Sequence, residues 1–371
     1  MPRFFLFWPI MSINSKKAHF SKKLLKWFTT NHRPMPWKEV KNPYHIWLSE
    51  IILQQTRVAQ GLPYYEHFVE KYPTVFELAN AREDEVMKSW EGLGYYSRAR
   101  NLHATAKQIA FEKGGEFPNT YEEIKALKGI GPYTAAAIAS FAFDLPYAVL
   151  DGNVYRVFSR CFGIKTPIDA TAGKKEFTLL ADDLLNKKYP ADYNQALMDF
   201  GATHCTPKKP KCESCPFQKD CSAYQSNRIS EYPVKSKKIT IRHRYFNYLV
   251  IRSANDLILN KRTSKDIWTN LYEFPMIETD VLLEKEEIEQ QASEAGLLPD
   301  SAKFVKSSKP LKQTLTHQRI NARFWEYKVD PSGFYKKSAF IFVQEDKLTK
   351  FAFPKIIDWY LKDKSLYLEL F

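Results

Sequence analysis

Residues 127–135 read Leu-Lys-Gly-Ile-Gly-Pro-Tyr-Thr-Ala and lie between two stretches of helical periodicity. The chain has only 13 glycines in 371 residues, so Gly129 and Gly131 need a structural reason to stand so close together. Glycines at a tight turn between helices let the backbone approach a ligand, and N–H groups at the second helix start point at an anion. The pattern favours a helix–hairpin–helix, which grips a DNA phosphate without reading sequence. A plain turn between two helices is the alternative.

Helical patterns extend from this hairpin in both directions, from about Ser15 to Ala223. Apolar residues recur at helical spacing in five clear stretches. These are Ile46–Gln60, Glu83–Trp90, Ser97–Glu112, Tyr133–Phe143 and Lys174–Leu185. We therefore predict an all-α domain over residues 15–227, preceded by a disordered extension over residues 1–14.

The character of the chain changes at Arg228. Residues 228–244 contain six Lys or Arg against one acidic residue, Glu231, and read as a basic linker. Such a segment is either a solvated tether or a strip that lies against phosphates. Strand-like runs follow at Tyr245–Arg252, Leu257–Leu259, Arg319–Val329 and Ser338–Phe342, with helical patterns at Val281–Ala295 and Pro354–Lys362. We predict a C-terminal domain of mixed α and β structure over residues 245–371.

The charge balance narrows the class of partner. Lys and Arg number 55 against 42 Asp and Glu, a net charge of +13, which points to nucleic acid or an anionic membrane surface. The apolar run Phe4–Met11 is too short to span a bilayer and lacks a small-residue cleavage site. We expect a cytoplasmic protein with no membrane association.

Four of the five cysteines lie within seventeen residues and form the strongest single signal. They are Cys205, Cys212, Cys215 and Cys221, spaced C-x6-C-x2-C-x5-C. Four thiolates suit zinc or a [4Fe–4S] cluster, and the single tight pair favours iron–sulfur over structural zinc. The three lysines of residues 206–211 would then face a phosphate backbone. Cys161 lies outside the set and is expected in the core.

Two acidic residues stand out as candidates for chemistry. Glu50 has apolar helical neighbours, so burial would raise its pKa and keep it protonated near neutral pH as a general acid. The alternative is a buried carboxylate satisfied by an arginine or a backbone donor. Asp151 lies within Leu-Asp-Gly-Asn at residues 150–153, where an Asp often simply caps the following helix.

Together these motifs resemble the helix–hairpin–helix DNA glycosylases, and within them the MutY type of adenine DNA glycosylase. The matching residues are Pro36-Trp37, Ser49-Glu50, Leu53-Gln54-Gln55-Thr56, Gly92-Leu93-Gly94-Tyr95-Tyr96-Ser97-Arg98, the hairpin, residues 150–153, Asn194-Gln195-Ala196-Leu197-Met198 and the four cysteines. The resemblance is dense over residues 20–235 and looser beyond. It implies a multi-domain fold: an all-α helix–hairpin–helix glycosylase domain with a [4Fe–4S] loop at residues 205–221, and a C-terminal α+β Nudix-like domain.

The resemblance also implies the roles of the catalytic residues. Glu50 would protonate a ring nitrogen of a flipped-out adenine, and Asp151 would stabilise the positive charge on the sugar. Asn153 and Tyr133 would position these groups and the water or sugar. Endonuclease III-like enzymes carry a Schiff-base lysine where this chain has Tyr133. Because a phenol forms no imine, we expect a monofunctional glycosylase.

A larger set is implied to contact DNA. Its members are Trp37, Lys38, Leu53, Gln54, Gln55, Thr56, Gly94, Tyr95, Tyr96, Ser97, Arg98, Gly129, Gly131 and Thr134. In the family, the residues at Gln55 and Tyr95 wedge into the opposite strand, with Leu53 beside them. Lys38 replaces the usual arginine, which keeps the charge but loses bidentate contact.

The C-terminal domain resembles the Nudix-like module that recognises 8-oxoguanine opposite adenine. Thr316 and His317 are its candidate lesion contacts, although the family more often has Phe-Ser-His where this chain has Leu315-Thr316-His317. A surface histidine is the alternative for His317. The acidic stretch at 283–289 lacks the glycine and Arg-Glu pair of nucleotide-hydrolysing Nudix enzymes, so we expect no such activity.

The expected partner is double-stranded DNA with an 8-oxoguanine:adenine or guanine:adenine mispair, bound by a monomer. One rival is an endonuclease III-like glycosylase and lyase acting on oxidised pyrimidines. The other is a non-catalytic DNA-binding module, which would have no use for an acid on an apolar face.

Overall fold

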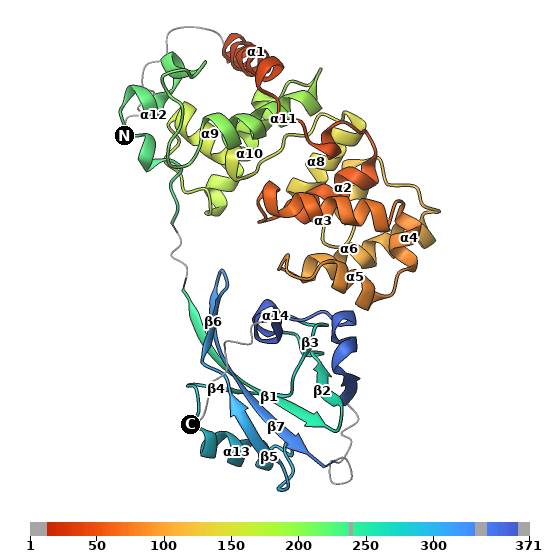
Figure 1. Ribbon diagram of the computed structural model, residues 1–371. Helices are drawn as coiled ribbons and strands as arrows, with labels where there is room; N and C mark the ends of the chain where they lie inside the picture. The colour runs from red at the N-terminus through yellow and green to blue at the C-terminus, as the bar shows by residue number, and fades with distance from the viewer. Residues whose placement is uncertain (1–12, 237–239, 331–339, 363–371) are drawn as a thin grey trace. The chain divides into compact units, whose positions relative to one another are not determined.

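The structure, a computed structural model, describes residues 13–236, 240–330 and 340–362 (Figure 1). The chain forms two compact units. The first contains the described residues of Met1–Gln55 and Gln108–Lys237, and the second those of Thr56–Lys107 and Lys238–Phe371. Residues 1–12 of the expected extension, 237–239 of the expected linker and 338–339 of an expected strand lie outside the described residues. No helix in the described ranges has the length and apolarity needed to cross a bilayer.

The first unit is helical throughout its described residues. Its α-helices are α1 (Ile13–Asn31), α2 (Pro43–Leu53), α7 (Tyr121–Ala126), α8 (Pro132–Phe143), α9 (Gly152–Phe162), α10 (Thr171–Leu184), α11 (Pro190–Asp199) and α12 (Ser222–Gln225). Short 3-10 turns occur at Pro36–Lys38, Gln218–Asp220 and Ile229–Glu231, and π-helical turns at Gln108–Glu112 and Phe200–His204. The predicted all-α character of this part of the chain is confirmed.

The predicted helix–hairpin–helix is formed by α7, the turn of residues 127–131 and α8. Gly129 takes a φ of +80°, a left-handed conformation that favours glycine. Gly131 is the N-cap of α8, and Pro132 occupies its first turn, where the missing N–H costs nothing. The amide N–H groups at the start of α8 are therefore left for a ligand.

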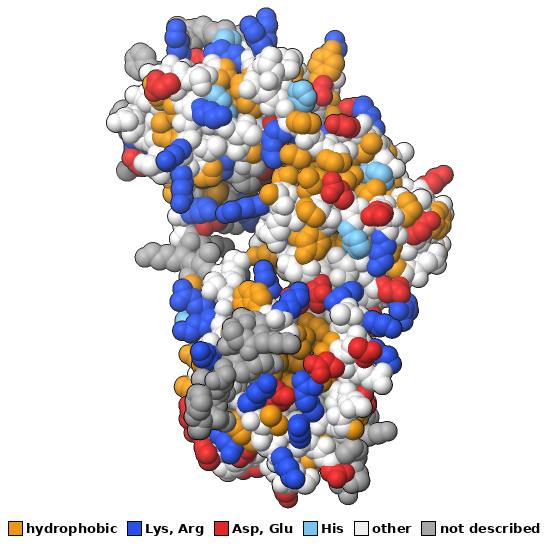
Figure 2. Space-filling model, viewed as in Figure 1, with side chains coloured by type: hydrophobic (Ala, Val, Ile, Leu, Met, Phe, Trp, Pro, Cys, Tyr) orange, Lys and Arg blue, Asp and Glu red, His pale blue; other side chains and the backbone are white. Residues whose placement is uncertain are grey.

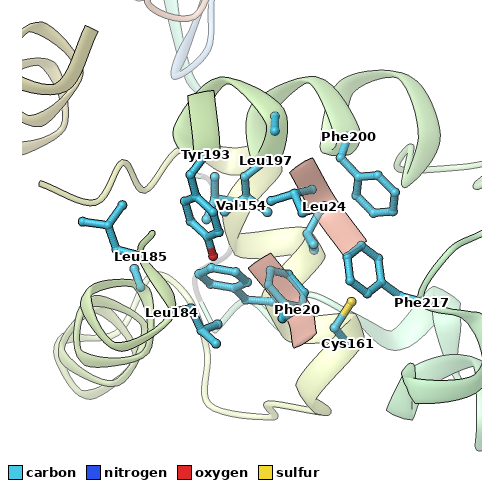
Figure 3. Packing of buried hydrophobic residues seen from close by; sticks show 14 of the residues in the cluster. Phe20, Leu24, Val154, Cys161, Leu184, Leu185, Tyr193, Leu197, Phe200 and Phe217 are labelled. Carbon is cyan, nitrogen blue, oxygen red and sulfur yellow. The ribbon is translucent and has the colours of Figure 1, made fainter. Parts of the chain in front are cut away.

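One apolar core holds α1 against α9, α10 and α11 (Figure 3). Phe20 and Leu24 of α1 point into it, and the ring of Phe20 stacks on that of Phe217 at 4.6 Å between centroids. Phe217 lies between two of the four cysteines, so the cysteine loop is packed onto this core rather than suspended in solvent. Cys161 of α9 belongs to the same core and is 6% exposed, as predicted.

The described residues of the second unit form a sheet and several helices. The helices before the sheet are α3 (Val58–Lys71), α4 (Val75–Asn80), α5 (Glu83–Ser89) and α6 (Ser97–Lys107). The strands are β1 (Arg242–Ser253), β2 (Asp256–Lys261), β3 (Tyr272–Glu273), β4 (Met276–Thr279), β5 (Lys303–Ser307), β6 (Leu311–Thr314), β7 (Gln318–Val329) and β8 (Phe340–Gln344). Two helices, α13 (Lys285–Glu294) and α14 (Lys355–Lys362), and a 3-10 turn at Glu345–Lys350 complete the unit.

Two long parallel strands form the centre of the sheet. β1 and β7 pair in register from Arg242 with Gln318 to Ser253 with Val329, and the main strand order is β3-β2-β1-β7-β5. Alternate residues of these strands face opposite sides. On one side, Leu249 and Trp325 share a core with α13. On the other, the ring of Tyr360 from α14 stacks on that of Phe324 at 4.0 Å. The predicted C-terminal α+β domain is confirmed.

Two details differ from the expectations. The helix predicted over Ile46–Gln60 is two helices, because α2 ends at Leu53 and α3 begins at Val58. Gln55 lies in the intervening turn at a φ of +54°, which no α-helix contains. The basic segment expected as linker up to Arg244 is also shorter, since β1 already begins at Arg242.

Candidate active site

The site is built around Glu50, on the buried face of α2. This helix begins at Asn42, whose side chain accepts the N–H of Tyr44 at 2.9 Å, and Pro43 fills its first position. Glu50 lies one turn before the end of α2 and is only 7% exposed. Its hydrogen-bond partner is Tyr133 of α8, whose hydroxyl donates to the carboxyl group.

The surroundings of Glu50 favour its neutral form. Burial raises the pKa of Glu50 to about 7, and the nearby charge of Asp151 acts in the same direction. The hydrogen bond from Tyr133 and the charge of Lys38 oppose the shift. A large fraction of Glu50 is therefore protonated at neutral pH, as the sequence predicted from its apolar neighbours.

Asp151 is the N-cap of α9, the alternative considered from the sequence. Its Oδ1 accepts the N–H groups of Asn153 and Val154 at 2.9 and 2.8 Å, and its Oδ2 accepts the Asn153 side-chain amide at 2.6 Å. Burial raises the pKa of Asp151, whereas these three hydrogen bonds and the charge of Arg156 oppose the rise. Two neighbouring carboxyl groups with little access to water carry one negative charge more easily than two. Hydrogen-bond donors on one group stabilise the charge on that group. The hydrogen bonds to Asp151 therefore oppose the rise in its pKa more than the single bond from Tyr133 opposes that of Glu50.

A buried ion pair lies beside this carboxyl pair. Lys38 follows the buried Trp37 in the 3-10 turn, and its ammonium binds Asp199 of α11 at 2.7 Å. Asp199 also accepts the backbone N–H of Arg33 at 3.0 Å. Burial lowers the pKa of Lys38, and the bond to Asp199 opposes this. The sequence analysis missed Asp199, although it directly follows a quoted motif.

Arg156 connects the carboxyl pair to the cysteine loop. Its Nη2 donates to the Asn153 Oδ1 at 2.8 Å, and its Nε donates to the backbone carbonyl of Cys205 at 2.7 Å. Arg156 was not singled out from the sequence. Its position three residues after Asn153 on α9 was the available signal, because residues at that spacing lie on one helix face.

The four cysteines all line one pocket. Arg160 clamps the loop that follows Cys205 by donating to the carbonyls of Thr206 and Pro207 at 2.8 and 3.0 Å, and it approaches the Cys205 sulfur at 3.4 Å. Among the described residues, no three His, Cys, Asp or Glu side chains converge to hold a single metal ion. A four-iron cluster takes one cysteine on each iron, so it needs sulfurs spread around a pocket. The donor set and the adjacent arginines fit such a group.

The candidate DNA residues of the first unit divide into exposed and buried ones. Gly129, Gly131 and Gln55 are exposed, and Leu53 is half-buried. Trp37 and Thr134 are buried, with the Thr134 hydroxyl accepting the Gln54 amide at 3.1 Å. Because the Trp37 and Thr134 side chains are buried, they stabilise the conformation of this surface and do not form part of it.

In the second unit, the turn of residues 92–98 presents Tyr95. Gly94 and Tyr95 both take positive φ, at +80° and +50°, and Tyr95 is 43% exposed. Arg98 is buried and donates to the Gly94 carbonyl at 3.1 Å, and it lies close to the side chain of Thr56. Tyr96 is buried as well, and Ser97 is the first residue of α6. These contacts fix the turn and leave the Tyr95 ring outside.

Thr316 and His317 lie in the turn between β6 and β7, and both are exposed. The Thr316 hydroxyl forms a hydrogen bond with that of Tyr95, within the second unit. Both residues line a pocket of this unit together with Tyr95 and Trp268. The structure therefore brings the turn that presents Tyr95 next to the turn that carries Thr316 and His317, a contact that the sequence did not predict.

Comparison with protein families accounts for most of the described chain. Residues 48–181 match the HhH-GPD superfamily of base excision DNA repair proteins. Residues 205–221 match the iron-sulfur binding domain of endonuclease III, which supports an iron–sulfur centre on the four cysteines. Residues 247–363 match the NUDIX domain.

Solved structures support the helical fold. A thermostable thymine-DNA glycosylase is 32% identical, with a TM-score of 0.54, and the match covers 58% of this chain and 100% of that one. A trapped covalent complex of endonuclease III with DNA is 22% identical, with a TM-score of 0.51, over 59% of this chain and 99% of that one. The second likeness shows the fold alone.

Two curated relatives of this chain carry the same enzyme name. An adenine DNA glycosylase of Buchnera aphidicola (subspecies Schizaphis graminum) is 37% identical over 263 residues, which are 71% of this chain and 76% of the relative. The adenine DNA glycosylase of Homo sapiens is 41% identical over 215 residues, 56% of this chain and 39% of the relative. The chain therefore belongs to the adenine DNA glycosylase family of base excision repair enzymes.

Proposed function

We propose that this enzyme excises adenine paired with 8-oxoguanine, and with guanine at a lower rate, and leaves an abasic site. The observation on which the proposal rests is the group of Glu50, Tyr133 and Asp151, in which Tyr133 donates to buried Glu50 and the start of α9 donates to Asp151. Hydrolysis of an N-glycosidic bond needs an acid for the leaving base and a negative charge near the sugar. The curated relatives are named as adenine DNA glycosylases.

The reaction begins with an adenine turned out of the duplex. Glu50 donates its proton to a ring nitrogen, so that the base leaves as neutral adenine with the electron pair of the glycosidic bond. Asp151 stabilises the positive charge that develops on the sugar. Water then adds to the anomeric carbon and its proton leaves, giving the abasic sugar.

The side chains present favour base removal without strand cleavage. A lyase needs a free amine to form an imine with the opened sugar. The position preceding Thr134 holds a phenol, Tyr133, and the ammonium group of Lys38, whose charge acts on Glu50, is bound to Asp199. We therefore propose a monofunctional reaction.

We propose that a monomer binds duplex DNA, and four surface features support the contact with DNA. The exposed hairpin has open space at Gly131, where an added Cβ would meet nothing within 4 Å, so a phosphate can approach the backbone. Gln55 and Tyr95 are exposed at strained positive φ values, as expected of residues held out to insert into a base stack. Lys208, Lys209 and Lys211 of the cysteine loop are exposed. Figure 2 shows Lys and Arg side chains gathered along one edge of the part that carries α9 to α12.

We assign a [4Fe–4S] cluster to Cys205, Cys212, Cys215 and Cys221. When bound, the cluster would tie the cysteine loop into one rigid piece. Through the Cys205 carbonyl, Arg156 and Asn153, that loop also supports the cap of α9. Arg156 and Asn153 thus connect the cysteine loop to the helix cap that positions Asp151.

Lesion recognition is proposed for the β6–β7 turn. Thr316 retains the hydroxyl and His317 the imidazole that can bond to the edge of 8-oxoguanine. Their exposure, the bond from Thr316 to Tyr95 and the shared pocket support this assignment. An opposite-strand wedge and a lesion reader would then act side by side.

Replacing Glu50 by Gln should abolish excision while leaving DNA binding intact. The amide keeps the shape but donates no proton to the leaving base, and general acids contribute about 10²- to 10⁴-fold. Single-turnover excision on an 8-oxoguanine:adenine duplex measures the loss, and a gel-shift titration measures binding. Glu39→Gln is the matched control, because it removes an exposed carboxylate nearby. Unchanged excision by Glu50→Gln would refute the acid role.

The excision rate should fall as the pH rises through about 7. The acid form of Glu50 is active, its pKa is about 7, and its fraction drops tenfold per pH unit above that value. Tyr133→Phe removes a hydrogen bond that stabilises ionised Glu50, so the falling limb should move to higher pH. A profile flat from pH 6 to 9, or a limb that moves to lower pH in Tyr133→Phe, would contradict the assignment.

Thr316→Ala should reduce the preference for 8-oxoguanine:adenine over guanine:adenine by about 3- to 10-fold, the worth of one hydrogen bond. The ratio of the two single-turnover rates is the readout, with the guanine rate unchanged. Thr349→Ala, at another exposed threonine of the same domain, is the control. An unchanged ratio in both Thr316→Ala and His317→Ala would exclude the turn as the lesion reader.

A further inference from the structure

The pocket lined by the four cysteines contains two more side chains of a kind that bind metals. Cys161 of α9 and His204, the last residue of the π-helical turn before Cys205, also line it. They are 6% and 7% exposed. Neither belongs to the set of ligands assigned above, so the pocket holds six potential donors.

Cys161 lies directly beside one of the four ligands. Its thiol is hydrogen-bonded to that of Cys221, so the two sulfur atoms are neighbours. The Cys221 thiol also lies 3.4 Å from the backbone carbonyl of Arg160, the residue that precedes Cys161. The Cys161 sulfur therefore lies next to the position that the Cys221 sulfur occupies.

Cys161 is also held firmly in this place. It belongs to the helix whose Arg156 and Arg160 grip the carbonyls of Cys205, Thr206 and Pro207. Its own helix turn packs in the core that contains Phe20 and Phe217. The sulfur is thus presented to the pocket by a rigid element.

His204 is the second additional side chain in the lining of this pocket. Within the described part of the chain, its buried Nε2 has no hydrogen-bond partner, although its ring is fixed by stacking on Phe200 at 4.9 Å. A buried nitrogen without a partner is costly unless a bound group satisfies it.

We propose that Cys161 is a substitute ligand of the cluster, able to take the place of Cys221 on its iron. The proposal rests on the iron–sulfur cluster proposed above. In the exchange, the Cys161 thiol gives up its proton and binds iron, while the Cys221 thiolate leaves the iron and takes up a proton. The iron keeps its oxidation state, so no oxidant or reductant is needed. The cluster then tolerates loss of Cys221 but not of the other three ligands.

Four variants purified without oxygen test this proposal: Cys221→Ala, Cys212→Ala, Cys161→Ala and the double variant Cys161→Ala/Cys221→Ala. Iron per protein and absorbance near 400 nm report the cluster, and circular dichroism reports folding. We expect Cys161→Ala to keep the wild-type iron content and Cys221→Ala to keep at least half of it. The iron content of Cys212→Ala and of the double variant should each fall more than fivefold. In the first variant no fifth thiol is hydrogen-bonded to the lost ligand, and in the second both Cys161 and Cys221 are missing.

The other outcomes each overturn the proposal. If Cys221→Ala loses iron as fully as Cys212→Ala, Cys161 does not replace Cys221. The same conclusion follows if the double variant retains as much iron as Cys221→Ala. Loss of iron in Cys161→Ala alone makes Cys161 a required ligand instead. A wild-type protein without iron removes the cluster itself, which separates failure of the cofactor assignment from failure of the substitution.

Discussion

The burial of two carboxyl groups beside each other is the constraint on which the first unit depends. In water both would be ionised at neutral pH, but together in a low-dielectric site they cannot easily hold two charges. Asp151 receives three hydrogen bonds from the start of α9, whereas Glu50 receives one from Tyr133. This unequal supply of donors stabilises the charged form of Asp151 more than that of Glu50. The same asymmetry produces the acid and the anion that the proposed reaction needs.

Helix α9 transmits this arrangement to the rest of the unit. Its N-terminus holds Asp151, its next turn holds Arg156, and its last turn holds Arg160 and Cys161 against the cysteine loop. A single helix thus positions the proposed catalytic carboxylate at one end and the cysteine loop at the other. The packing of Phe20 and Phe217 onto the same core explains why the loop can be ordered so far from the reaction.

Local motifs in the sequence predicted the fold class, the hairpin and the common pocket of the four cysteines. The raised pKa of Glu50 also followed from local spacing, because its helical neighbours are apolar. The break at Gln55 was not predicted. Apolar residues continue at helical spacing through Ile46–Gln60, and this pattern gives no sign of a single residue at positive φ. Asp199 and Arg156 were missed because their partners, Lys38 and the Cys205 carbonyl, are distant in sequence. The capping role of Asp151 was anticipated, and the structure confirms it.

The most direct test of the account is single-turnover excision on a duplex with one 8-oxoguanine:adenine pair, labelled on the adenine strand. Each time point is analysed with and without hot alkali, which cleaves abasic sites. The account predicts a break that appears only after alkali, because Glu50 and Asp151 remove the base and Tyr133 forms no imine. A break without alkali, or tight binding with no product, would contradict it.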